Sequence, residues 1–213
     1  MKITKIEKQK KHKDRYNIFL DGEFAFGLYE DSLLKFGLRT NDELSDKEIT
    51  EIKDYDGFIF GKTVAYSYLS YKQRSRKEVI QKLRKNKIPE EVIDKIISLL
   101  VEMKYINDES YAKLYLENKL SGKPMGNRLL RIKLQEKGID RETTEKVIDE
   151  NYDEEKELQS AEKLLEKYSE KVKGKNDFEK RKKCFNYLVS RGFDFELAGR
   201  VLDLNKNLKS AAS

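Results

Sequence analysis

The segment EKGIDRETTEKVI, at residues 136–148, decides the fold because the chain repeats its pattern twice more. The other copies read NKIPEEVIDKII at residues 86–97 and SRGFDFELAGRVL at residues 190–202. An apolar residue precedes a short amphipathic stretch in each copy, and these residues lie 51 and 54 positions apart: Ile88, Ile139 and Phe193. Such a period is typical of a tandem array, but it is longer than a tetratricopeptide or ankyrin repeat.

The repeat extends upstream of these segments as two further helical patterns. Residues at i, i+1 and i+4 lie on one helix face. This spacing occurs three times, with an arginine at one apolar position: Val79, Ile80 and Leu83; Leu130, Arg131 and Leu134; Cys184, Phe185 and Leu188. Further upstream, an alanine and a leucine one turn apart begin each unit: Ala65 and Leu69; Ala112 and Leu116; Ala161 and Leu165. Each repeat is therefore predicted to contain three helices.

Three units of about 50 residues cannot each bury an apolar face alone, whereas units stacked in tandem share a core. The predicted fold is mainly α, with three tandem three-helix repeats that form an elongated curved body. We expect a monomer with nine helices in its repeats. The predicted boundaries are 45–106 for a linking helix and repeat 1, 107–155 for repeat 2, 156–204 for repeat 3, and 205–213 for a flexible tail.

Residues 1–44 follow a different period, in which apolar and polar residues alternate. Two alternating runs are joined by Asp21 and Gly22, a dipeptide that favours the type I′ turn of a β-hairpin. Because an isolated two-stranded hairpin is marginal in water, residues 2–9 are expected to add a third strand. The N-terminal segment is therefore predicted to be a small antiparallel sheet.

Helical signals begin after this sheet. A short helix is expected at residues 29–36, closed by Gly37, and Ser45 with Glu48 forms the capping box that starts the linking helix. Two glycines weaken the middle of the linking helix and predict a kink or a break before the apolar run at 64–69: Gly57 and Gly61.

The composition excludes several classes of protein. Charged residues make up 39% of the chain, the net charge is +6, and no apolar run approaches the length of a membrane span. The basic N-terminus lacks the apolar segment of a secretory signal, so a cytoplasmic location is expected. Cys184 is the only cysteine and His12 the only histidine, which excludes an internal disulfide and a Cys/His zinc cluster. No cofactor is expected.

Catalytic chemistry has little support in this sequence. No pair of carboxylates is flanked by apolar residues that would raise the pKa of one of them. Cys184 lies on the apolar triplet of repeat 3 and is expected in the core, while His12 lies in a lysine run and is expected at the surface. Gly122 and Lys123 resemble the end of a phosphate-binding loop. The positions before them lack the first glycine of that motif, and proline follows the lysine in place of serine or threonine. A non-enzymatic protein is predicted.

Cations recur on the second helix of every repeat, whereas the third helices carry acids such as Glu90 and Glu145. If the units stack in similar orientations, these cations form a basic stripe suited to a polyanion or an acidic groove. Arg74 and Arg76 flank Ser75, which opens a second capping box where free N–H groups also favour anions. An ordinary solvated surface is the competing interpretation. The candidate binding residues are Lys72, Arg74, Arg76, Lys77, Lys82, Arg84, Lys85, Arg128, Arg131, Lys133, Lys180, Arg181, Lys182 and Arg191.

Three segments resemble the RecX family of bacterial recombination regulators: YLSYKQRS at 68–75, MKYINDESYAK at 103–113 and YLVSRGFDFE at 187–196. The resemblance covers nearly the whole chain and implies three tandem three-helix repeats behind the strand-rich extension of many low-GC Gram-positive members. The sequence departs from the family at Gln73, where many members have proline, and at Lys104, where glycine often precedes the tyrosine. Neither departure changes the repeat spacing.

The resemblance implies a non-enzymatic modulator, most often an inhibitor, of RecA. Family members lie in the helical groove of the RecA–DNA filament and suppress its ATPase, strand-exchange and co-protease activities in recombination, DNA repair and the SOS response. RecA and its filament are thus the expected partners, with weak direct binding to single- or double-stranded DNA as a further expectation. Two alternatives stay open: a sequence-independent DNA- or RNA-binding repeat protein without RecA dependence, and a helical scaffold for another protein.

Overall fold

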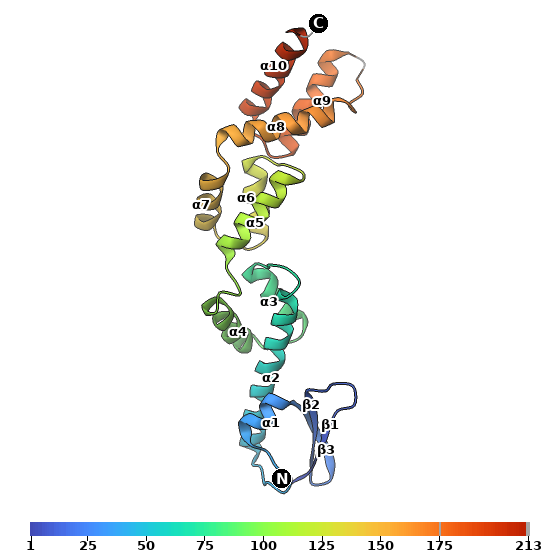
Figure 1. Cartoon of the computed structure of the whole chain (residues 1–213), viewed down its shortest axis with the longest axis vertical. Coiled ribbons are helices and arrows are strands. Elements are labelled where there is room, and N and C mark those ends of the chain that lie inside the picture. The colour runs from blue at the N-terminus through green and yellow to red at the C-terminus, as the bar shows by residue number, and fades with distance from the viewer. Residues whose placement is uncertain (175, 212–213) are drawn as a thin grey trace. The chain divides into compact units, whose positions relative to one another are not determined.

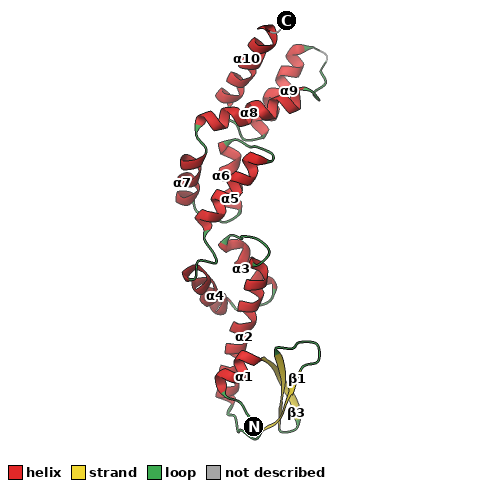
Figure 2. Cartoon of the chain, in the orientation of Figure 1, coloured by secondary structure: helices red, strands yellow, loops and turns green. Residues whose placement is uncertain are grey.

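The computed structural model describes residues 1–174 and 176–211, with side chains described as far as Leu204. By its internal contacts the chain divides into two compact units, the first of which comprises Met1–Gln73 and Glu78–Ile106. The second unit comprises Arg74–Lys77 and the chain from Asn107 onward. Among the described residues, strands are confined to the N-terminal segment and the other regular elements are helices (Figure 2).

The N-terminal segment is a three-stranded antiparallel sheet of strand order β1-β2-β3 (Figure 1). Its strands are β1 (Ile3–Lys8), β2 (Arg15–Leu20) and β3 (Glu23–Tyr29). The turn between β2 and β3 places Asp21 at φ 49° and Gly22 at φ 93°, the two positive angles that a type I′ turn requires. Both the hairpin and the third strand are confirmed.

Helices α1 (Glu30–Phe36) and α2 (Asp46–Leu69) follow the sheet. Gly37 ends α1 with φ 60°, and the capping box at the start of α2 is complete. Of the kink or break predicted within α2, the break is wrong, because the helix runs without interruption to Leu69. A Cβ at Gly61 would collide with Ile96 Cδ1, so this glycine permits close packing against the neighbouring helix. That packing outweighs the cost of about 1 kcal/mol for a glycine inside a helix.

A buried carboxylate ties the sheet to α2. Asp56 accepts hydrogen bonds of 2.7 Å from the Tyr29 N–H and from the Ser32 hydroxyl. The Arg15 guanidinium lies 3.8 Å from the same carboxylate and packs over the Tyr29 ring. A buried charge is costly unless it is paired and hydrogen-bonded, and here both conditions are met. Apolar side chains complete this core: Ile3, Ile18, Leu20, Leu28, Leu38, Leu44, Ile49 and Ile52.

Each repeat contains three helices, as predicted. The C-terminal half of α2 is the first helix of repeat 1, and the others are α3 (Arg76–Lys85) and α4 (Glu90–Glu102). Repeat 2 comprises α5 (Asp108–Ser121), α6 (Asn127–Glu136) and α7 (Arg141–Asn151). Repeat 3 comprises α8 (Glu154–Ser169), α9 (Asp177–Ser190) and α10 (Phe195–Ala211). Helix α10 thus continues into the segment 205–213, for which the sequence predicts a flexible tail, and residues 212 and 213 lie outside the described residues.

Aligned positions of the repeats have the same environment. The alanines of the first helices are all fully buried, and each contributes to the separate core of its own repeat: Ala65, Ala112 and Ala161. The turn between the second and third helices has one residue of positive φ in every repeat, at 60°, 85° and 91°: Lys87, Gly138 and Gly192. A side chain is disfavoured in this conformation, so Lys87 is the exception among the three.

Candidate partner-binding surface

The start of α3 is held by residues of repeat 2, and these contacts lie within the second unit. The Ser75 hydroxyl donates a hydrogen bond of 2.7 Å to the carbonyl of Lys137. The Lys77 ammonium donates a hydrogen bond of 3.0 Å to the carbonyl of Glu136. The turn approaches so closely that a Cβ at Gly138 would lie 2.5 Å from the Lys77 Cβ. Ser75, expected as a helix cap, and Lys77, a candidate binding residue, are therefore both bound by residues of repeat 2.

The start of α6 is held by repeat 3 in the same way. The backbone N–H of Asn127 donates a hydrogen bond of 2.7 Å to one carboxylate oxygen of Glu157. The side-chain amide of Asn127 donates a hydrogen bond of 2.6 Å to the other oxygen. The N–H of Arg128 donates 3.2 Å to the carbonyl of Gly192. A Cβ at Gly192 would overlap Leu129, so glycine is required here both by φ and by space. The two contacts recur at equivalent positions of successive repeats.

Burial raises the pKa of the Glu157 carboxyl above its ordinary value, and the nearby charge of Asp194 acts in the same direction. The hydrogen bond from the Asn127 N–H opposes this shift. The side chain of Glu157 is buried, at 7% exposure, and it satisfies N–H groups at a helix start that would otherwise lack a partner. Glu157 is therefore a structural group of the contact between repeats 2 and 3.

Besides Arg74, seven of the fourteen candidate cations have an interaction within the chain. Arg84 makes two hydrogen bonds of 2.8 Å to the Glu90 carboxylate, and Arg131 donates 2.8 Å to Glu145. Each of these pairs joins a second helix to the third helix of its own repeat, so the acids of the third helices neutralise part of the proposed stripe. The remaining five contact an acid, a carbonyl or an aromatic ring: Lys77, Lys82, Lys133, Arg181 and Arg191.

Arg191 has a structural role that the sequence did not indicate. Its guanidinium donates a hydrogen bond of 2.8 Å to the carbonyl of Pro124 and one of 3.2 Å to the carbonyl of Lys123. These bonds hold the loop that precedes α6, in which the sequence lacks the pattern of a phosphate-binding loop. Arg74 is half-buried and also interacts within the chain. Both arginines are thus partly occupied by contacts within the chain.

Six candidate cations are exposed, and within the described part of the chain their side chains make no hydrogen bond or ion pair. They are Lys72, Arg76, Lys85, Arg128, Lys180 and Lys182. They come from the start and end of α3, the start of α6, the N-terminal part of α9 and the loop before α3. These cations are available to an external anion, and every repeat supplies at least one of them.

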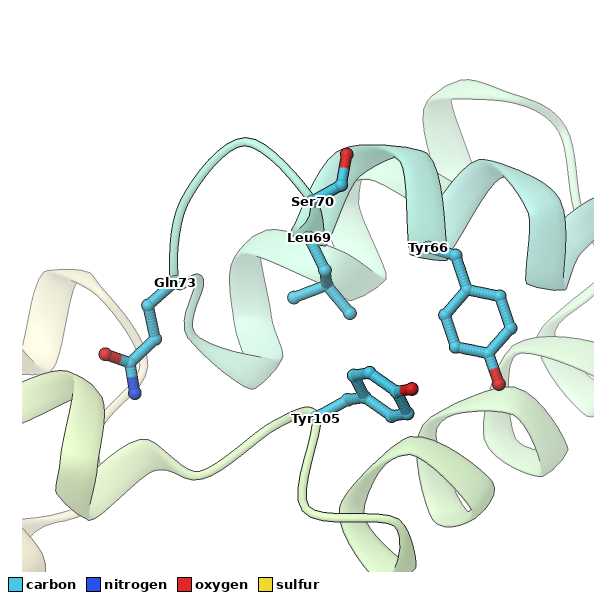
Figure 3. A pocket seen from close by; sticks show the side chains of 5 residues that line it. All are labelled: Tyr66, Leu69, Ser70, Gln73 and Tyr105. Carbon is cyan, nitrogen blue, oxygen red and sulfur yellow. The ribbon is translucent and has the colours of Figure 1, made fainter.

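An apolar pocket lies beside the end of α2 within the first unit (Figure 3). Its lining residues are Tyr66, Leu69, Ser70, Gln73 and Tyr105. The rings of Tyr66 and Tyr105 meet edge to face with centroids 5.3 Å apart, and Figure 3 shows Leu69 pointing toward the Tyr105 ring. The polar groups of these five side chains are two phenols, a hydroxyl and an amide.

Two expectations about single residues are confirmed. Cys184 is buried in the core of repeat 3, and His12 is exposed. Within the described residues, no group of three or more His, Cys, Asp or Glu side chains could hold a metal ion. Within the same part of the chain, no helix has the length and hydropathy needed to cross a membrane.

Sequence reasoning missed the contacts between repeats. Ser75, Asn127 and Glu157 take part in them, and the sequence marked only the serine, as a helix cap. A usable signal was present in the turns, where glycine occupies the same position in repeats 2 and 3. A glycine that recurs at one repeat position indicates a positive φ or a close approach of the backbone.

The three-helix units and the N-terminal sheet define a helical-repeat protein. Four family models match the chain in order: the regulatory protein RecX N-terminal domain at residues 1–45, and the first, second and third RecX three-helix domains at 62–100, 107–148 and 154–202. The chain belongs to the RecX family of regulatory proteins, which confirms the resemblance noted in the sequence.

Similar proteins agree with this assignment. The chain is 36% identical over 202 residues to the regulatory protein RecX of Leuconostoc mesenteroides, covering 95% of this chain and 75% of that protein. It is equally similar to the regulatory protein RecX of Staphylococcus aureus strain Newman, of which it covers 74%. A crystal structure of a regulatory protein RecX matches 95% of this chain and 98% of its own with a TM-score of 0.75 and 30% identity. RecX from Lactobacillus salivarius matches 70% of this chain and 99% of its own, with a TM-score of 0.64 and 30% identity.

Proposed function

We propose that this protein is a non-enzymatic modulator of RecA that binds the RecA–DNA filament and lowers its activity. On this proposal it lies in the groove of the filament and suppresses ATP hydrolysis, strand exchange and co-protease activity in recombination, repair and the SOS response. It acts in the cytoplasm as a monomer. The observation that carries the proposal is membership of a family of regulatory proteins over the whole repeat array.

The exposed cations support the same proposal. Each repeat presents at least one cation without an internal partner among the described residues, such as Arg76, Arg128 and Lys182. A polyanion or an acidic groove would gain from several such contacts at once. Because the cations belong to successive units of one chain, binding of one unit raises the effective concentration of the next. Loss of the cations of one repeat should therefore weaken the effect on RecA by more than their share.

The test is ATP hydrolysis by RecA on single-stranded DNA, measured against the concentration of this protein. The wild-type protein should lower hydrolysis at concentrations far below those that saturate the DNA. Lys180→Glu with Lys182→Glu should remove most of the effect, because both side chains are exposed and make no ion pair within the described part of the chain. The matched control reverses two exposed acids of α4, Glu91→Lys with Asp94→Lys, and should change the effect little. Circular dichroism checks that every variant keeps its helices.

A second function is favoured by the same cations. They would also suit a sequence-independent DNA- or RNA-binding protein that does not depend on RecA. In that case RecA turnover would respond only at concentrations of the protein that saturate the DNA. A protein that leaves RecA turnover unchanged while it binds single-stranded DNA would establish this alternative and reject the first. A helical scaffold for another protein would show neither effect.

A further inference from the structure

Repeat 3 carries a second groove, between α9 and α10. It is lined by Phe178, Arg181, Lys182, Phe185, Gly199 and Leu202. Phe178 is 76% exposed, whereas Leu202 is buried at 8% exposure. The groove thus has an apolar floor and an exposed aromatic side chain at its edge. An exposed phenylalanine beside such a floor is suited to pack against an apolar side chain of a partner.

Gly199 leaves the floor of this groove open. It lies inside α10 at a negative φ, and a Cβ built there would meet no atom within 4 Å. Neither backbone strain nor internal packing therefore requires glycine at this position. In a helix interior, glycine is less stable than alanine by about 1 kcal/mol. A costly residue without an internal reason fits a site where space is kept for an external group.

The charges of the groove select the kind of partner. Arg181 and Lys182 line it, and Lys180 is exposed one residue earlier on α9. The Arg181 guanidinium lies 2.6 Å from the Asp203 carboxylate and donates a hydrogen bond of 3.4 Å to the carbonyl of Leu202. Lys182 has no such partner among the described residues. The groove therefore keeps an excess of positive charge beside its apolar floor.

We infer that this groove binds an acidic peptide that places one apolar side chain over Gly199 and its carboxylates on Arg181 and Lys182. A peptide fits better than a polynucleotide, because a single apolar depression flanked by two or three cations matches one side chain between acids. The inference goes beyond the proposed function, since it assigns a ligand chemistry to one groove and holds whether or not RecA is affected. Binding of the ligand carboxylate competes with Asp203 for the Arg181 guanidinium.

The experiment measures fluorescence anisotropy of a short labelled peptide in which leucine is flanked by aspartate and glutamate. The full-length protein should bind it, and a peptide with lysine in place of the acids should not bind. Gly199→Leu fills the floor and should weaken binding by about tenfold or more, and Gly199→Ala, which adds a single methyl group, should weaken binding to a smaller extent. Lys182→Glu should weaken binding, and Lys163→Glu, an exposed lysine of α8, should not.

Asp203→Asn provides a test in the opposite direction. It removes the internal competitor of Arg181 and should tighten binding of the acidic peptide. Helical content and thermal unfolding of each variant show whether the fold is kept. Equal binding by wild-type protein and Gly199→Leu would overturn the inference, as would absence of binding to the acidic peptide. Binding of single-stranded DNA that responds to Gly199→Leu while the peptide does not bind would assign the groove to nucleic acid instead.

Discussion

The backbone N–H of Arg76 donates a hydrogen bond of 2.8 Å to the carboxylate of Asp108. The same relationship joins Asn127 to Glu157 at 2.7 Å. In both cases the first residue of a second helix is bound by an acid from the first helix of the next repeat. Helix starts have free N–H groups and a partial positive charge, and a carboxylate satisfies both. The same type of polar contact, a helix start bound by a carboxylate from further along the chain, thus occurs twice within the second unit.

Gly192→Ala should destabilise the protein strongly. The residue has φ 91°, and a Cβ would overlap the backbone and side chain of Leu129. We expect the free energy of unfolding to fall by about 2 kcal/mol or more. Urea unfolding followed by circular dichroism measures the change. The control is Gly57→Ala, where a Cβ would meet no atom within 4 Å in a helix, and a gain of up to about 1 kcal/mol is expected. Equal stability of Gly192→Ala and wild type would refute the close approach.

Glu157→Gln should change how stability depends on pH. Because the folded pKa of Glu157 is raised, its favourable contribution is complete below the unfolded pKa and is lost as pH rises through the folded pKa. The glutamine variant lacks this titration. The free energy of unfolding of wild type minus that of the variant should therefore decrease as pH rises above the ordinary glutamate pKa of about 4.3. Urea unfolding at several pH values measures this difference, and a constant difference would contradict the prediction.

Asp56→Ala should weaken the attachment of the sheet to α2. The substitution leaves the Tyr29 N–H and the Ser32 hydroxyl without their shared acceptor. Each lost partner of a buried donor costs about 1–3 kcal/mol. Hydrogen exchange of the Tyr29 amide should accelerate, and the free energy of unfolding should fall. Asp54→Ala, an exposed residue of the same helix, serves as the control and should have little effect.

Exposed cations should matter more for DNA binding than paired ones. Arg128 is exposed and its side chain has no partner among the described residues, whereas Arg84 is bound to Glu90. The slope of log affinity against log salt concentration is negative. If Arg128 contacts a phosphate of single-stranded DNA, Arg128→Gln should make this slope shallower by about 0.7. Arg84→Gln should change the slope less. Anisotropy titrations at several salt concentrations measure both slopes, and a larger change for Arg84→Gln would show that the wrong cations have been chosen.

The parts of the fold that the sequence predicted depend on local patterns. The Asp21-Gly22 turn and the helix end at Gly37 follow from the φ values that glycine and aspartate accept. The repeats follow from apolar spacing, because aligned residues such as Ala65 and Ala112 are buried in equivalent cores. These features need only neighbouring residues, so a single sequence contains the information.

The parts that the sequence did not predict depend on residues far apart in the chain. Gly61 indicated a weak helix, but its contact with Ile96 shows that tertiary packing sets its role. Ser75 meets the carbonyl of Lys137 across 62 residues, and no local pattern marks that pair. Charge spacing indicated a surface of cations, yet it did not show which of them, such as Arg191, bind carbonyl groups within the chain.

Lys87 occupies the turn position at which repeats 2 and 3 receive the helix of the repeat before them. Its equivalents Gly138 and Gly192 each receive the start of the preceding repeat's second helix, where a Cβ would leave no room. Lys87 also has a positive φ, but it carries a side chain, which is exposed. A duplicated unit inserted ahead of repeat 1 would meet this side chain where its helix had to dock. A longer descendant of this protein would have to exchange Lys87 for glycine before it could gain a fourth unit at that end.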